Sequence, residues 1–249
     1  VQGKISSLLL ESDAKGLIAV LKSPYDLTTG EQKEILSAAR AHFENVSLMV
    51  GGEEVGGFGR QILELPLNES GTLLLQVPAG SFSQVNWSTN LRLLNASIEQ
   101  AGIAAGSTVY DLFAGAGNFA LPFARSGMKV VAVECDKRLV NLGRENAKRY
   151  GLDNKLQYVD SSVERFLSRL PKTDKADLVI ADPPRSGLGQ MIHSMNFASR
   201  LQLISCHLPS FVRDIKGLLE NGWQVERIQP FDMFPQTSHV EILGVLSRS

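Results

Sequence analysis

Alternating apolar and polar positions over the first eighty residues predict a small α+β unit. Residues 5–12 and 16–23 have the length and composition of strands, and residues 13–16 join them as a turn. Thr28 followed by Glu31 resembles a capping box and predicts a helix through about Phe43. Three further strands are expected at 46–52, 59–67 and 71–78, separated by glycine-rich turns. This section carries no chemical motif.

From about residue 82 the pattern changes to strands that alternate with helices. A helix from about residue 88 to 102 precedes strands at 108–113, 129–134, 155–160, 176–182 and 201–206, with helices such as 136–150 and 209–219 between them. The last strands are expected at 223–232 and 239–247. This alternation predicts an α/β fold, a parallel sheet with helices on both faces. We therefore expect two domains, at 1–80 and 81–249, and ligands at the carboxyl ends of the strands.

Composition narrows the class of protein further. The chain has 249 residues, 43% of them hydrophobic, and a net charge of −1, which is ordinary for a globular protein. No apolar run approaches the roughly 20 residues of a membrane span, and no signal peptide is found. Cys135 and Cys206 are too few for a disulfide framework or a cysteine-based zinc or iron–sulfur site. We expect a cytoplasmic protein without a metal; whether a further domain precedes Val1 stays open.

Four successive strands of the predicted sheet end in an acid. The first runs into the turn from Asp111 to Phe119, which contains two glycines, and the next three end at Glu134, Asp160 and Asp182. Glycines allow a sharp turn and the close approach of a ligand, although a strand-to-helix turn alone can also require them. Position 120 is Ala rather than a third glycine, which weakens a nicotinamide site. Glu134 suits ribose hydroxyls and Asp160 an adenine amino group.

The order of these motifs resembles the class I methyltransferases over about residues 107–249. In addition, four segments are similar to the RNA uracil-5-methyltransferase family in order and spacing: residues 82–86, 111–122, 203–214 and 232–241. Within that family they look nearest to the bacterial 23S rRNA members, and residues 1–80 fit the family's central domain. The resemblance implies S-adenosylmethionine as cofactor. The side chains and turns that it implies for the cofactor are those of Gln84, Phe113, Gly115, Gly117, Asn118, Glu134, Asp160 and Asp182.

The family's chemistry explains the remaining residue types. Carbon 5 of uracil is a poor nucleophile, but a thiolate that adds at carbon 6 converts the ring into an enolate that can accept a methyl group at carbon 5. A base must then remove the carbon 5 proton. By resemblance, Cys206 is the nucleophile and Glu241 the base, while Phe82 stacks near the target base.

Further substrate contacts follow from the same resemblance. Asp182 is expected to contact the uracil edge or the cofactor amine, and Arg185 to bind phosphate or substrate. The substrate would be a uridine in ribosomal or transfer RNA, unstacked into the pocket of a monomeric enzyme.

The sequence also departs from the family. His207-Leu208 stands where the family usually has Asn-Pro, so the geometry around Cys206 is open, and His207 is expected to be a solvent-facing turn residue. The RNA-binding barrel and four-cysteine iron–sulfur segment of many relatives are not found in these residues.

Two alternatives therefore stay open. One is a class I methyltransferase acting on an exocyclic base amine, which Arg185 disfavours because such enzymes carry an aromatic residue after Asp-Pro-Pro. The other is an inactive cofactor- or RNA-binding module, in which Cys206 would be an inert buried thiol, the usual state of a free cysteine. The intact Cys206, Glu241 and Asp182 count against this second alternative.

Overall fold

The chain divides into two compact units. The computed structural model describes residues 3–81, 83–84, 86–171, 173–237 and 240–248. The first unit comprises residues 1–65 and 74–83, and the second comprises residues 66–73 and 84–249. The division into folding domains at residue 80 stays a prediction.

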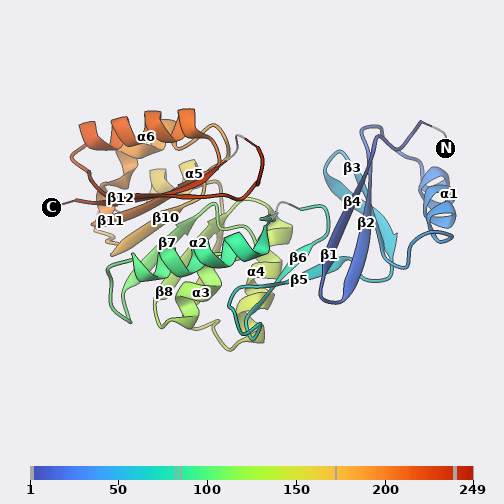
Figure 1. The fold of residues 1–249 in the computed structure, drawn as a ribbon, viewed down its shortest axis with the longest axis horizontal. Coiled ribbons are helices and arrows are strands. Elements are labelled where there is room, and N and C mark those ends of the chain that lie inside the picture. The colour runs from blue at the N-terminus through green and yellow to red at the C-terminus, as the bar shows by residue number, and fades with distance from the viewer. Residues whose placement is uncertain (1–2, 82, 85, 172, 238–239, 249) are drawn as a thin grey trace. The chain divides into compact units, whose positions relative to one another are not determined.

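The first unit is a four-stranded sheet with one helix packed on it (Figure 1). Its strands are β1 (Ser7–Asp13), β2 (Gly16–Ser23), β3 (Val46–Val50) and β4 (Glu53–Phe58), in that order across the sheet, and α1 spans Thr29–Ala39. Strands β2 and β3 are parallel because α1 connects them, whereas the two outer pairs are antiparallel. Strands β5 (Ile62–Pro66) and β6 (Leu74–Pro78) form a separate two-stranded sheet.

The predicted elements of this unit are mostly found, with two corrections. The capping box of Thr28 and Glu31 is present, with the Glu31 N–H donating to the Thr28 hydroxyl. The helix, however, ends at Ala39 rather than near Phe43. Strand β4 was missed because its sequence, EEVGGF, holds glycines and acids that have low strand propensity. Its pairing with β3 overrides that propensity.

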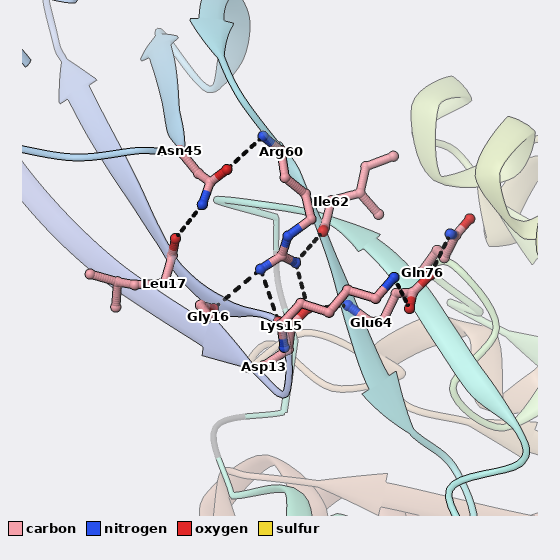
Figure 2. A network of polar contacts seen from close by, with 9 residues as sticks. All are labelled: Asp13, Lys15, Gly16, Leu17, Asn45, Arg60, Ile62, Glu64 and Gln76. Atoms are coloured by element: carbon pink, nitrogen blue, oxygen red, sulfur yellow. Dashed lines mark hydrogen bonds and ion pairs between the residues drawn. The ribbon is translucent and has the colours of Figure 1, made fainter. Parts of the chain in front are cut away.

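An ion pair holds the β1–β2 turn to strand β5 (Figure 2). The Asp13 side chain is 1% exposed and accepts hydrogen bonds from the Arg60 guanidinium at 2.6 and 2.9 Å. The backbone N–H groups of Lys15 and Glu64 donate to the same carboxylate at 2.8 and 2.7 Å. Burial alone would raise the pKa of Asp13, but these hydrogen bonds lower it below its ordinary value. The network fixes the hairpin that starts the unit.

The second unit is built on a seven-stranded sheet in the order β12-β13-β11-β10-β7-β8-β9. The strands are β7 (Thr108–Leu112), β8 (Lys129–Glu134), β9 (Leu156–Asp160), β10 (Leu178–Ala181), β11 (Arg200–Ser205), β12 (Gln224–Phe231) and β13 (Glu241–Ser247). Strand β13 is antiparallel to both of its neighbours, so the expectation of a fully parallel sheet is wrong there. The reason is that the described residues between β12 and β13, 232–237 and 240, contain no crossover helix.

Helices cover both faces of this sheet, as predicted (Figure 1). One layer holds α2 (Trp87–Glu99), α3 (Ala120–Arg125) and α4 (Lys137–Arg149); the other holds α5 (Val163–Arg169), the 3-10 helix η1 (Gly189–Phe197) and α6 (Leu208–Glu220). The core between the sheet and the second layer includes fully buried Leu112, Val179 and Leu203. Strand order reverses between β7 and β10, the point at which sheets of this kind bind ligands.

Candidate active site

The turn after β7, residues 113–118, contains three residues in the left-handed region of backbone conformation, and we call it the glycine loop. Phe113, Gly115 and Gly117 have φ values of 65°, 55° and 111°. A positive φ is strained for a bulky residue such as Phe113 and is typical of functional sites. A Cβ at Gly115 would meet no atom within 4 Å, whereas one at Gly117 would lie 2.7 Å from the Tyr158 hydroxyl. Gly115 therefore leaves space for a ligand, and Gly117 allows the loop to pack on β9.

Polar side chains from three elements hold this glycine loop. The Gly115 N–H donates to Glu134 of β8 at 2.9 Å. Asn146, fully buried in α4, donates to a carbonyl of the loop at 3.2 Å. Asn118 exchanges two amide hydrogen bonds with buried Asn90 of α2, at 2.9 and 3.1 Å. Asn90 and Asn146 were not predicted, because only the packed helices bring them to the loop.

Asp111 lies at the base of the glycine loop and is 1% exposed. Neither of its carboxylate oxygens has a hydrogen-bond partner of good geometry among the described residues. Burial and the nearby Asp182 and Glu134 carboxylates raise the pKa of Asp111 well above its ordinary range. Such a buried carboxyl group either stays protonated or binds a cation, and the ammonium group of an amino acid fits. Asp111 lies in the motif predicted after the first strand, but no role was predicted for it.

Strand register brings Cys206 and Glu241 together. Ser205 pairs with Ile242 in the antiparallel β11–β13 ladder, so the next residue on each strand, Cys206 and Glu241, continues that register. Glu241 is 3% exposed and Cys206 is half-buried. Asp182 directly follows β10, the strand on the other side of β11. The two predicted catalytic side chains therefore lie at one edge of the sheet, with Asp182 beside them.

The charges at this edge are coupled. Burial and the Asp182 carboxylate raise the pKa of Glu241 to about 8, and burial raises the pKa of Asp182 to about 7. Burial, Glu241 and Asp182 raise the pKa of the Cys206 thiol, while a hydrogen bond from the Arg185 side chain lowers it. Arg185 is therefore the group here that favours the thiolate, the form that acts as a nucleophile.

The segment after Cys206 forms the start of α6 despite its unusual sequence. The His207 ring nitrogen Nδ1 accepts the Ser210 N–H at 3.4 Å, and His207 is the N-cap of the helix. Pro209 lies in the first turn, where its missing N–H costs nothing. The expected solvent-facing His207 is thus a half-buried cap. The His207 imidazole therefore caps the helix that begins directly after Cys206.

The other predicted site residues differ in surroundings. Gln84 is buried, while Arg185 and Asp160 are exposed. Phe82 lies outside the described residues. Asp160 lines a pocket of about 430 Å³ between the sheet and α5, together with Tyr110 and others. Because side chains alternate along a strand, Tyr110 points to the face of the sheet opposite Asp111.

No group of three or more His, Cys, Asp or Glu side chains is arranged to hold a metal ion among the residues described. Within the same residues, no helix has both the length and the apolar character to cross a membrane.

The sheet with one antiparallel strand, the glycine loop and the strand-end acids define a class I methyltransferase fold. A solved structure of this fold, the tRNA (uracil-54, C5)-methyltransferase of Pyrococcus abyssi in complex with S-adenosyl-L-homocysteine, superposes with a TM-score of 0.73 over 96% of this chain and 59% of that one, at 20% identity. The Pyrococcus horikoshii protein TYW2, in complex with MeSAdo, gives 0.60 over 98% of this chain and 90% of that one, at 15% identity.

Sequence comparison identifies the family. Residues 61–249 match the family model described as tRNA (Uracil-5-)-methyltransferase. The chain therefore belongs to this family, whose methyl donor is S-adenosylmethionine, and the predicted family, fold class and cofactor are confirmed.

Curated relatives carry related names. The chain is 32% identical over 246 residues to the 23S rRNA (uracil(1939)-C(5))-methyltransferase RlmD of Shewanella sediminis, covering 95% of this chain and 53% of that protein. It is also 32% identical to the Salmonella typhi protein of the same name, covering 94% and 54%. An uncharacterized RNA methyltransferase of Thermotoga maritima is 36% identical over 67% of this chain and 38% of its own length. The chain spans about half the length of the RlmD relatives it matches.

Proposed function

We propose that this protein transfers a methyl group from S-adenosylmethionine to carbon 5 of a uridine in RNA. The observation that carries the proposal is the placement of Cys206 beside buried Glu241 at the ligand-binding edge of the sheet. The names of the relatives favour ribosomal RNA as the substrate class, with transfer RNA as the alternative. We expect a cytoplasmic monomer that needs no metal.

The proposed cofactor site is the glycine loop and the acids around it. S-adenosylmethionine supplies the methyl group as an electrophile. The Asp111 carboxylate would take the ammonium group of its amino-acid part, because that carboxylate is buried and has no hydrogen-bond partner of good geometry in the described part of the chain. Glu134 and Asp160 would bind the ribose and the adenine. Contacts from Gln84, Phe113, Gly115, Gly117 and Asn118 complete the proposed set.

Cys206 is the proposed nucleophile. Its thiolate adds to carbon 6 of the uracil, and the electron pair of the C5–C6 double bond moves into an enolate. The enolate carbon would then attack the methyl group, so that the C5–CH₃ bond forms while the S–CH₃ bond breaks and S-adenosylhomocysteine leaves. Arg185 supports the first step because its hydrogen bond favours the thiolate. Phe82 would hold the unstacked base, and Asp182 would contact the uracil edge or the cofactor amine.

Glu241 is the proposed base. After methyl transfer, carbon 5 carries both the methyl group and a proton, and the covalent bond to Cys206 persists. Removal of that proton by the Glu241 carboxylate restores the double bond and expels the thiolate. The raised pKa of Glu241, about 8, places its titration near working pH, as efficient general-base catalysis requires.

A trapping experiment tests this proposal. Transcripts of ribosomal and transfer RNA with 5-fluorouridine in place of uridine carry fluorine where the proton must leave, so the covalent adduct cannot resolve. With S-adenosylmethionine present, we expect a denaturation-stable protein–RNA complex linked through Cys206, measured on gels and by mass spectrometry of the linked peptide.

Two variants sharpen the result. Cys206→Ser is expected to abolish the adduct, and Cys135→Ser, which changes the exposed cysteine, is expected to keep it. Absence of an adduct with every RNA tested would contradict the proposal. Methyl transfer that persists in Cys206→Ser would instead favour methylation of a base amine.

A further inference from the structure

Side chains of helix α6 form hydrogen bonds with the backbone of the loop that follows β10. This loop, residues 182–189, is called the Arg185 loop because it carries Arg185. The Leu188 N–H donates to Asp214 of α6 at 2.6 Å, and the Gly189 N–H does so at 3.3 Å. Arg213, the preceding residue of α6, donates to the Ser186 carbonyl at 2.6 Å and to the Asp214 carboxylate at 2.7 Å. One pair of helix residues therefore binds the loop at three backbone positions.

Asp214 is a charged residue on the apolar side of its helix. Phe211, Asp214 and Leu218 share one buried stripe of α6, and Asp214 is 2% exposed. Such a charge is costly unless hydrogen bonds and an ion pair compensate it, and the Arg185 loop and Arg213 provide both. An apolar side chain would pack better at this position of the helix. We therefore attribute the carboxylate to its hydrogen bonds with the Arg185 loop.

The loop is shaped to receive this carboxylate. Gly187 has φ +76°, and a Cβ there would lie 2.2 Å from an Asp214 oxygen and 2.6 Å from an Arg213 nitrogen. The close approach therefore requires glycine. The Asp214 carboxylate accepts the N–H groups of Leu188, the N-cap of η1, and of Gly189, its first residue, so it fixes where the loop ends.

The same helix begins at the nucleophile. Cys206 directly precedes His207, the N-cap of α6, and Arg185 of the loop lies near enough to the Cys206 thiol to lower its pKa. We propose that Arg213 and Asp214 are positioning residues, which hold the Arg185 loop to the helix that starts at Cys206 so that Arg185 meets the thiol and Asp182 stays beside Glu241. Neither residue of the pair touches the reacting atoms. The inference rests on the proposed role of Cys206.

The reactivity of the thiol tests the pair. In a Cys135→Ser background, Cys206 is the only thiol, and its alkylation by iodoacetamide is followed against pH. The groups that face it are Glu241 of β13 and Asp182 and Arg185 of the loop. We expect Asp214→Ala to release Arg185 and to slow alkylation at pH 7.5 about tenfold, because each unit rise in thiol pKa removes nine-tenths of the thiolate.

Graded variants make the result specific. Asp214→Asn keeps one acceptor and should restore most of the rate, while Arg213→Ala, a change at a half-exposed side chain, should slow alkylation about threefold. Ile215→Val shortens a buried side chain of the same helix but leaves both Arg213 and Asp214 intact, so it should leave the alkylation profile unchanged. With an RNA substrate, the Asp214→Ala enzyme should lose kcat by about tenfold to a hundredfold with an unchanged KM.

Wild-type alkylation profiles in both Asp214→Ala and Arg213→Ala, well below their melting temperatures, would overturn the inference. Equal slowing in Ile215→Val would also overturn it, since the effect would then be one of stability. Alkylation needs no RNA, so the pair is tested even if no uridine is methylated. A slowed thiol without any RNA adduct would support the positioning pair and count against the proposed function.

Discussion

At the scale of single residues, the surroundings of Glu241 decide what its carboxyl group can do. It is the first residue of a buried strand and faces Asp182, so the charged form is disfavoured until positive charge arrives. The Glu241 and Asp182 carboxylates also raise the pKa of the Cys206 thiol and so oppose formation of the thiolate. Arg185 lowers this pKa and favours the thiolate. A cationic methyl donor bound nearby would relieve all three groups at once, because its charge favours their ionised forms.

Glu241→Gln tests the proposed base. Glutamine keeps the size of the side chain but cannot take a proton, so methyl transfer should proceed and release should fail. We expect a methylated covalent complex with unmodified RNA to accumulate, with steady-state turnover reduced at least about a hundredfold. Mass spectrometry of the complex and single-turnover methyl transfer measure the two steps.

Glu220→Gln, at the exposed end of α6, is the matched control and should turn over normally. Normal turnover by Glu241→Gln itself would remove Glu241 from its proposed role.

At the scale of elements, Tyr158 of β9 sets the distance between the sheet and its helices. Its ring lies against two glycines: a Cβ at Gly143 of α4 would be 2.2 Å from the ring, and one at Gly117 would be 2.7 Å from the hydroxyl. The hydroxyl is buried without a hydrogen-bond partner among the described residues. Tyr158 thus packs against both the glycine loop and α4. We therefore expect a change in the packing of α4 to alter the shape of the proposed cofactor site.

Gly143→Ala tests this packing. Alanine favours a helix over glycine by about 1 kcal/mol, but its Cβ would overlap Tyr158 and overpacking costs about 1–3 kcal/mol. We therefore expect net destabilisation of the second unit and weaker binding of S-adenosylmethionine. Denaturant unfolding and calorimetry measure these two effects.

Gly30→Ala, in α1, is the control because the nearest atom to its Cβ would be 3.9 Å away. It should be neutral or slightly stabilising. A Gly143→Ala protein as stable as Gly30→Ala would show that Tyr158 yields freely and has no spacing role.

At the scale of the whole molecule, buried acids give stability an unusual dependence on pH. Asp111, Asp182 and Glu241 have folded-state pKa values above their ordinary ones. The folded state therefore binds more protons than the unfolded state between the two values, and stability falls as pH rises through that window. Asp13 has the opposite shift, and its contribution is lost only when the pH falls to acidic values.

We expect the melting temperature of the second unit to decrease by about 5–10 °C between pH 5 and pH 9, with the Glu241 part of the loss falling between its ordinary pKa of 4.5 and about 8. Calorimetry across this range measures the slope. Glu241→Gln should flatten it, since the glutamine amide carries no charge at either end. A melting temperature that rises steadily to pH 9 would contradict the buried-acid account.

Much of the fold could be predicted because it follows from local pattern. The alternation of strands and helices gave the α/β class, and the Thr28 capping box gave the start of α1. Strand β4 could not be predicted from its glycines and acids, and the reversed direction of β13 depends on which strands it inserts between. Both are tertiary pairings that override local preference.

The sequence by itself determined which residues are candidates for the site, because Cys206, Glu241 and the strand-end acids lie in segments that resemble one family. Only the tertiary structure decided that Glu241 is buried beside Cys206, that Asp111 has no well-aligned hydrogen-bond partner among the residues described, and that Asp214 holds the Arg185 loop. The physical reason is that the functional group of a residue follows from its type alone. Its burial, its pairing and its pKa depend on neighbours that are distant in sequence and meet only in the folded sheet.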